Sequence, residues 1–152
     1  ILADDLILSE PGCFKQLLKV HEKTKSSVLG VFSASENQVS NYGVISSKNI
    51  EGIEKVDGIV EKPQSDEAPS NLAVFGRYIL PKDIFSNIEQ TKAGLNNEIQ
   101  LTDAIQELIS NKDVFALEFE GRRYDCGSKE GYISAIIDRA TSIDKYKSII
   151  ER

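Results

Sequence analysis

Carboxylates and a lysine stand at three places where an apolar run of the chain meets a turn or a helix start. These places are Asp4-Asp5, Glu61-Lys62-Pro63 and the segment 98–103, which ends at Asp103. A rigid element can hold the backbone at such places while the side chains still reach a ligand. Carboxylates from two of them could share a divalent cation, and the lysine could neutralise a phosphate. The pattern therefore predicts a site for a phosphate and a metal.

Each of these signals also has a purely structural explanation. Adjacent strand residues point to opposite faces, so at most one of Asp4 and Asp5 enters the same site, and the pair could instead cap the next turn. Glu61 and Lys62 could form a solvated charged turn that a proline closes. Asp103 falls in the first turn of an expected helix, where the helix dipole favours an acid in any case. Taken singly, these residues do not distinguish a ligand site from ordinary caps and turns.

Composition favours one ordinary globular domain over residues 1–152. The chain has 152 residues, 40% of them hydrophobic and 28% charged, with four prolines and a net charge of −6. A chain without a long basic run is not expected to bind nucleic acid. Two distant cysteines and a single histidine argue against zinc and favour free thiols. We expect a cytoplasmic protein, because no run approaches the roughly 18 apolar residues of a membrane span and no signal peptide is visible.

The apolar pattern predicts an α/β fold with a mixed, mostly parallel sheet flanked by helices. A strand over 1–8, a helix after Pro11 and a strand over 27–33 suggest a parallel crossover. An antiparallel hairpin follows, with its turn at Ser46–Asn49. The remaining strands are expected at 71–80 and 114–119, and the remaining helices at 81–90, 99–110 and 128–141, with a continuation to 152 left open. Arg122 and Arg123, next to the turn at Gly121, are expected in solvent.

Several common catalytic motifs are absent from the sequence. It contains no GxSxG, HExxH, P-loop or GxGxxG pattern. Hydrolases with a serine nucleophile and classical dinucleotide enzymes therefore lose support.

Taken together, the motifs resemble those of the bacterial UTP–glucose-1-phosphate uridylyltransferases, a branch of the sugar-phosphate nucleotidyltransferases. They stand in the family's order over nearly the whole chain. The segments that carry the resemblance are 2–6 (LADDL), 42–44 (YGV), 60–63 (VEKP), 68–73 (APSNLA), 76–78 (GRY), 97–105 (NEIQLTDAI), 124–127 (YDCG) and 131–132 (GY).

The resemblance implies a Rossmann-like nucleotidyltransferase fold and a Mg²⁺-dependent reaction of UTP with glucose 1-phosphate that yields UDP-glucose and pyrophosphate. It also implies a homo-oligomer, a dimer or tetramer, and no nucleic-acid or membrane partner. The implied roles of single residues, matched motif by motif, are as follows: Asp4 as Mg²⁺ ligand, Asp5 as a neighbouring active-site acid, Gly43 with its backbone against the sugar, Glu61 on the glucose hydroxyls, Lys62 on the sugar phosphate, Asp103 as a second metal contact, and Asp125-Cys126-Gly127 as a structural turn near the sugar.

The family's glycine-rich loop, which grips the nucleotide triphosphate, has no counterpart in this sequence and belongs upstream of Ile1. We therefore expect a carboxyl-terminal piece of a longer protein, inactive by itself. Three alternatives stay open at this point: a non-catalytic module that binds sugar nucleotides, a related nucleotidyltransferase that uses dTTP or another sugar, and a structural fragment that serves assembly.

Overall fold

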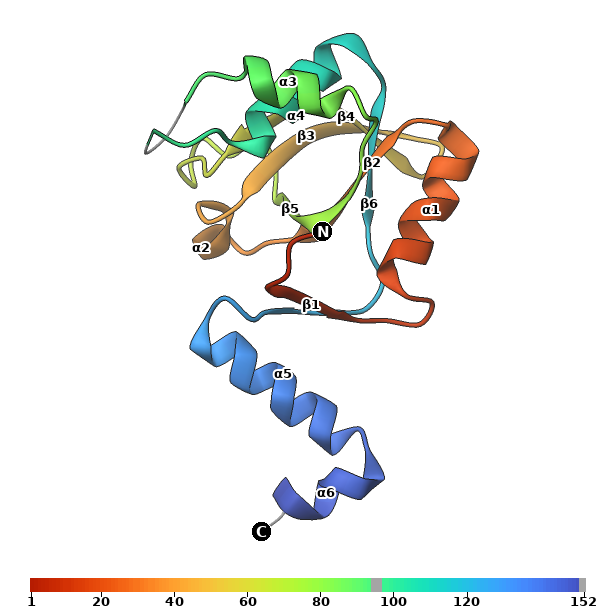
Figure 1. Cartoon of the computed structure of the whole chain (residues 1–152), viewed down its shortest axis with the longest axis vertical. Helices are drawn as coiled ribbons and strands as arrows, with labels where there is room; N and C mark the ends of the chain where they lie inside the picture. The colour runs from red at the N-terminus through yellow and green to blue at the C-terminus, as the bar shows by residue number, and fades with distance from the viewer. Residues whose placement is uncertain (94–96, 151–152) are drawn as a thin grey trace. The chain divides into compact units, whose positions relative to one another are not determined.

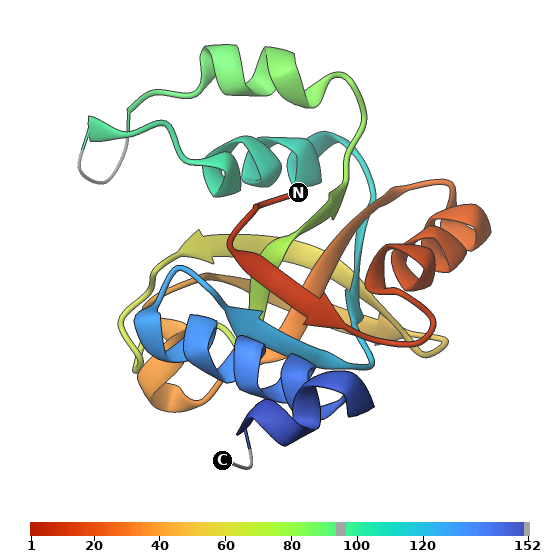
Figure 2. The same cartoon turned by 60° about the horizontal axis from the view of Figure 1, so that its bottom comes forward.

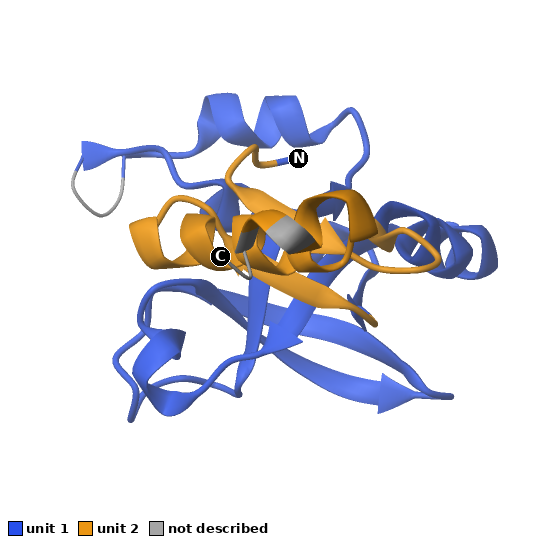
Figure 3. Cartoon of the chain, turned by 90° about the horizontal axis from the view of Figure 1, so that it is seen from below, with its two compact units in different colours: residues 1, 14–119 blue, residues 2–13, 120–152 orange. Residues whose placement is uncertain are grey.

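The computed structural model describes residues 1–93 and 97–150. The chain divides into two compact units, which Figure 3 colours separately. The first unit holds Ile1 and Phe14–Phe119, and the second holds Leu2–Cys13 and Glu120–Arg152. Each unit is described by itself below. A single domain over residues 1–152 stays a prediction.

The first unit is built on a closed five-stranded barrel (Figure 1). Its strands, in barrel order, are β2 (Ser27–Ser33), β5 (Leu72–Ile79), β3 (Gly43–Ile50), β4 (Ile53–Glu61) and β6 (Val114–Glu118). Neighbouring strands pair antiparallel except β2 and β6, which close the barrel as a parallel pair.

The α/β class is confirmed, but the expected mostly parallel sheet is wrong. Among the described strands the sheet is mixed and mostly antiparallel. Strand β1 (Asp5–Leu8) does not pair with β2 through a crossover. It pairs antiparallel with β7 (Arg122–Asp125), a strand that the sequence did not predict, in a separate two-stranded sheet. A short apolar run indicates a strand but says nothing about its partner, which here lies more than a hundred residues along the chain.

The predicted antiparallel hairpin is confirmed as β3 and β4, but its turn is not at Ser46–Asn49. The turn residues are Glu51 and Gly52, both with positive φ (52° and 81°), as a tight two-residue hairpin turn requires. The polar residues before them remain in β3 because they bond across the hairpin. Ser47 Oγ donates to Glu54 Oε2 at 2.6 Å, and Asn49 Nδ2 donates to Glu54 Oε1 at 2.7 Å.

Helices cover the barrel and complete its core. Helix α4 (Leu101–Asn111) packs against β4 and lies beside α3 (Ile84–Gln90), as Figures 1 and 2 show. Leu101, Ala104, Ile105 and Leu108 fall on one face of α4, so this face joins the buried cluster. The fully or nearly fully buried members of that cluster are Leu29, Val31, Ile45, Val56, Ile59, Val74, Ile84, Ala104, Ile105, Leu108, Val114 and Ala116.

Two more helices precede and interrupt the barrel strands. Helix α1 (Cys13–Thr24) was expected from the sequence and buries Leu17 and Val20. Helix α2 (Glu36–Val39) was not expected, although Ser35 and Gln38 form a capping box, which is typical of a helix start.

The second unit combines the β1–β7 ribbon with two helices. Helix α5 (Lys129–Thr141) packs against β7 and against α6 (Asp144–Ile150). The predicted helix over 128–141 is thus confirmed. The continuation left open to 152 is a separate helix as far as Ile150, and residues 151–152 lie outside the described part. Cys13 and Cys126 are free thiols. No helix in the described part of the chain has the length and apolarity that crossing a bilayer needs.

Candidate functional site

Three of the residues predicted to bind ligand lie together where β3 and β4 meet in the first unit. Gly43 and Glu61 are directly paired across these antiparallel strands. Lys62 follows Glu61, and its Nζ lies 3.8 Å from Glu61 Oε1. The Glu61 side chain is 18% exposed and the Lys62 side chain 45% exposed. A partly shielded carboxylate beside an accessible ammonium can accept bonds from hydroxyls and attract an anion.

Lys62 has an unusual backbone conformation. Its φ is +44°, in the left-handed region, and its amide donates to Tyr42 O at 3.0 Å. A residue before proline normally stays extended, so this conformation is strained. Buried Pro63 and the Tyr42 bond hold it in place.

A fourth residue, which the sequence did not single out, completes this group. Thr102, in the first turn of α4, donates from Oγ1 to Glu61 Oε2 at 3.0 Å and is only 9% exposed. We call Gly43, Glu61, Lys62 and Thr102 the Glu61 cluster. A Cβ built on Gly43 would lie 2.7 Å from Thr102 Cγ2 and 3.3 Å from Glu61 Oε2, so position 43 has no room for a side chain.

Asp103 follows Thr102 on α4 and has an exposed side chain. The helix dipole favours an acid in this first turn. Asp103 thus lies at the same end of α4 as Thr102, and its side chain faces solvent.

The aspartate pair belongs to the second unit, and its two side chains differ in environment. Asp5 is buried, and its Oδ1 accepts from Arg123 Nε at 2.5 Å. Asp4 is exposed, while its carbonyl accepts from the Cys126 amide at 2.8 Å. The expectation that at most one of the pair serves a ligand stays a prediction. The expectation of a solvated Arg123 is wrong, because its side chain is only 12% exposed in the ion pair with Asp5.

The loop after β7 forms the predicted turn. The Gly127 amide donates to Asp125 Oδ1 at 3.1 Å, and a Cβ on Gly127 would lie 3.3 Å from Asp4 Oδ2. Gly131 is more tightly constrained, since a Cβ there would lie 2.0 Å from Asp125 O. These contacts place the exposed Asp4 carboxylate beside a close-packed turn.

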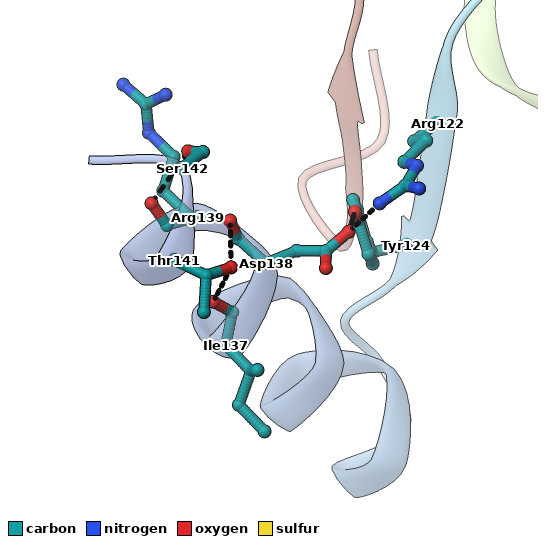
Figure 4. A network of polar contacts seen from close by, with 7 residues as sticks. All are labelled: Arg122, Tyr124, Ile137, Asp138, Arg139, Thr141 and Ser142. Atoms are coloured by element: carbon teal, nitrogen blue, oxygen red, sulfur yellow. Dashed lines mark hydrogen bonds and ion pairs between the residues drawn. The ribbon is translucent and has the colours of Figure 1, made fainter. Parts of the chain in front are cut away.

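A polar network ties α5 to β7 (Figure 4). Asp138 on α5 accepts from the Tyr124 hydroxyl and from Arg122 Nη1. The hydroxyl bond, followed by the arginine bond, lowers the pKa of Asp138 below its ordinary value, and the same carboxylate raises the pKa of Tyr124. Arg122 thus has a partner, although its side chain is largely exposed as expected. The network fixes α5 against β7.

No group of three or more histidine, cysteine or acidic side chains in the described part of the chain is arranged to hold a metal ion. Magnesium needs no such cage, because it is usually held by one or two carboxylates together with substrate phosphates and water. The exposed carboxylates of Asp4 and Asp103 fit that mode of binding.

Comparison with known proteins identifies the family. The family model described as nucleotidyl transferase matches residues 1–142. The chain belongs to the nucleotidyl transferase family.

Individual relatives of this nucleotidyl transferase point to one branch. The chain is 45% identical over 148 residues to a UTP–glucose-1-phosphate uridylyltransferase of Staphylococcus haemolyticus, covering 97% of this chain and 51% of the relative. It is 45% identical over 138 residues to the corresponding Pseudomonas aeruginosa protein, covering 89% of this chain and 50% of that protein. The chain thus spans about half the length of the curated relatives that it matches.

Solved structures agree with this placement. A UDP-glucose pyrophosphorylase complexed with UDP-glucose superimposes with a TM-score of 0.90 and 44% identity, covering 94% of this chain and 55% of that chain. A UTP-bound enzyme from Acinetobacter baumannii gives a TM-score of 0.83 at 32% identity, covering all of this chain and 55% of that chain. The resemblance stated from the sequence motifs is confirmed.

Proposed function

We propose that the protein transfers a uridylyl group from UTP to glucose 1-phosphate, releasing pyrophosphate and forming UDP-glucose. The observation that carries the proposal is the 45% identity to UTP–glucose-1-phosphate uridylyltransferases over nearly the whole chain. The Glu61 cluster supports it with a carboxylate for hydroxyls and a cation for a phosphate within 3.8 Å of each other.

The Glu61 cluster would bind glucose 1-phosphate. Lys62 would pair with the sugar phosphate as a point charge, and Glu61 would accept bonds from the glucose hydroxyls. Gly43 would let the backbone approach the sugar, because no side chain stands there. The strained conformation of Lys62 is of the kind that collects at ligand sites.

The acidic residues would serve the metal ion. Asp4, and Asp103 in the first turn of α4, would contribute carboxylate oxygens for Mg²⁺, while Asp5 would stand beside Asp4 in its ion pair with Arg123. When bound, the metal supplies charge neutralisation at the phosphates.

The reaction would be an in-line displacement. The phosphate oxygen of glucose 1-phosphate forms a bond to the α-phosphorus of UTP, and the bond from that phosphorus to the bridging oxygen of pyrophosphate breaks. Such transfers depend on positioning and charge neutralisation more than on a protein nucleophile. Lys62 and Glu61 would hold the attacking sugar phosphate in the required orientation.

The relatives' activity belongs to proteins about twice as long, so we propose that the 152 residues alone do not turn over substrate. The test is pyrophosphate release with UTP, glucose 1-phosphate and Mg²⁺, measured on the full-length product of the gene and on this chain. Turnover by the full-length product that prefers UTP and glucose 1-phosphate over dTTP and other sugar phosphates supports the proposal. Binding of UDP-glucose by the full-length product without turnover would instead favour a non-catalytic module.

We also propose that the protein forms homo-oligomers through the second unit. Four large apolar side chains of α5 are exposed: Tyr132, Ile133, Ile136 and Ile137. Apolar groups of this kind favour association. Light scattering coupled to size exclusion would show a dimer or tetramer. A monomeric wild-type protein at micromolar concentration would contradict the proposal.

A further inference from the structure

Thr102 makes the closest polar contact to the Glu61 carboxylate among the described residues. Its hydroxyl donates to Glu61 Oε2 at 3.0 Å, whereas Lys62 Nζ lies 3.8 Å from Glu61 Oε1. We propose that Thr102 is a positioning residue, which fixes the Glu61 carboxylate so that the sugar of a hexose 1-phosphate is bound in one orientation. The inference rests on the function proposed above.

The helix that carries Thr102 is itself fixed against the strand that carries Glu61. One turn further along α4, Gln106 Oε1 accepts from the Ile59 amide at 2.8 Å. Residues 102 and 106 lie one turn apart on the same side of the helix, so both side chains reach β4, one at the Glu61 carboxylate and the other at the Ile59 backbone amide. Two hydrogen bonds at matching spacing therefore hold α4 to the end of β4, and only the Thr102 bond reaches the carboxylate.

The methyl group of Thr102 adds a second constraint. It occupies the space over Gly43, where an added Cβ would lie 2.7 Å from it. Gly43 is paired with Glu61 in the hairpin, so one threonine touches both strands of the proposed sugar site. Burial of Thr102, at 9% exposure, limits its own freedom and hence that of the carboxylate that it binds.

This arrangement has a consequence for specificity. With Oε2 bonded to Thr102, the Glu61 carboxylate presents Oε1 on the side of Lys62. A sugar hydroxyl that donates to Oε1 then stands at a defined distance from the phosphate held by Lys62. Without the threonine bond the carboxylate can rotate, and the match between hydroxyl and phosphate positions is lost.

Three variants of the full-length product test the role. Thr102→Val keeps the shape and removes the hydroxyl, Thr102→Ser keeps the hydroxyl, and Gln106→Leu removes the other hydrogen bond between α4 and β4. Steady-state pyrophosphate release would give KM for glucose 1-phosphate and for UTP separately. Thermal unfolding would be followed in parallel, and assays would run below the lowest melting temperature.

We expect Thr102→Val to raise the KM for glucose 1-phosphate about tenfold and to leave the KM for UTP within about twofold, as loss of a hydrogen bond to a charged group implies. Thr102→Ser should stay within about twofold of wild type for both substrates. Gln106→Leu should lower the melting temperature, and any change in the KM for glucose 1-phosphate should match the change in the KM for UTP.

The results that overturn the role are distinct from those that overturn the function. An unchanged KM for glucose 1-phosphate in Thr102→Val, or an equal rise in Gln106→Leu, removes the positioning role while the transferase function stands. Absence of turnover by the wild-type full-length product with any sugar 1-phosphate removes both.

Discussion

Lys62 differs from an ordinary surface lysine in its backbone and in its neighbour. Its backbone is strained at a φ of +44°, and its ammonium lies beside the partly shielded Glu61 carboxylate. Lys48, on β3 of the same hairpin, is a suitable comparison, because its largely exposed side chain pairs with Asp57 at 3.5 Å. If ligand binding explains the position of Lys62, the two lysines must differ in their effect on activity.

We predict that Lys62→Ala raises the KM for glucose 1-phosphate by about ten- to a hundredfold, since a charge-assisted contact to phosphate is lost. Lys48→Ala should change it by less than about twofold. Steady-state pyrophosphate release by the full-length product measures both. Equal KM values for glucose 1-phosphate in the two variants would show that Lys62 does not bind the sugar phosphate.

The strain at Lys62 makes a separate prediction about stability. Lys62→Gly should be more stable than Lys62→Ala by about 0.5–1 kcal/mol. The left-handed region costs a residue with a Cβ about 1–2 kcal/mol, and glycine avoids this cost but loses part of the gain because its unfolded chain has more conformational entropy. Both variants lack the ammonium, so charge cancels in the comparison. Chemical denaturation measures the difference, and an alanine variant at least as stable as the glycine variant would show that position 62 is not strained.

Replacement of the two neighbouring arginines of β7 is predicted to lower the free energy of unfolding by very different amounts. Arg123→Gln leaves the buried Asp5 carboxylate without its ion-pair partner and should lower the free energy of unfolding by about 3–5 kcal/mol. Arg122→Gln breaks a largely exposed pair with Asp138 and should lower the free energy of unfolding far less, because water screens such a pair. Urea denaturation of both variants decides this, and similar losses would mean that the Asp5–Arg123 pair is solvated.

At the scale of elements, the start of α5 depends on a glycine. The Ser128 side chain caps the helix by accepting from the Gly131 amide at 3.0 Å, which brings position 131 against Asp125 O. A methyl group there would lie 2.0 Å from this backbone oxygen, whereas a Cβ on Gly12 in the same unit meets nothing within 4 Å.

Gly131→Ala should therefore lower the free energy of unfolding by about 1–3 kcal/mol despite the better helix propensity of alanine, because overpacking outweighs it. Gly12→Ala should stay within about 0.5 kcal/mol of wild type. Denaturation monitored by circular dichroism compares the two. A Gly131→Ala variant as stable as Gly12→Ala would show that the turn before α5 adjusts without cost.

Sequence patterns predicted the elements better than their pairing. The apolar stripe of α4 and the β3–β4 hairpin follow directly from local periodicity. The partner of β1 does not, because β7 is a short charged run, Arg122–Asp125, that becomes a strand only by pairing. The turn at Glu51-Gly52 was missed because polar residues such as Asn49 suggest a turn unless their cross-strand partners are known.

At the scale of the whole molecule, motif order along the chain predicted the family and the grouping of Gly43, Glu61 and Lys62. It could not show that Thr102 joins them, because a threonine in a first helical turn has no signal apart from its tertiary contact. It also could not show that Asp5 and Arg123 pair across 118 residues. Both contacts join segments distant in sequence, where local pattern carries no information.

The proposed site has Glu61 and Lys62 as ligands of the glycosyl phosphate and Asp4 as a ligand of the magnesium ion. A crystal structure of the full-length product with UDP-glucose and Mg²⁺ tests this most directly. We predict that Glu61 lies within hydrogen-bond distance of a glucose hydroxyl, that Lys62 contacts the phosphate attached to the sugar, and that Asp4 binds the metal. A glucosyl group bound away from Glu61 and Lys62, or a metal without Asp4 among its ligands, would contradict it.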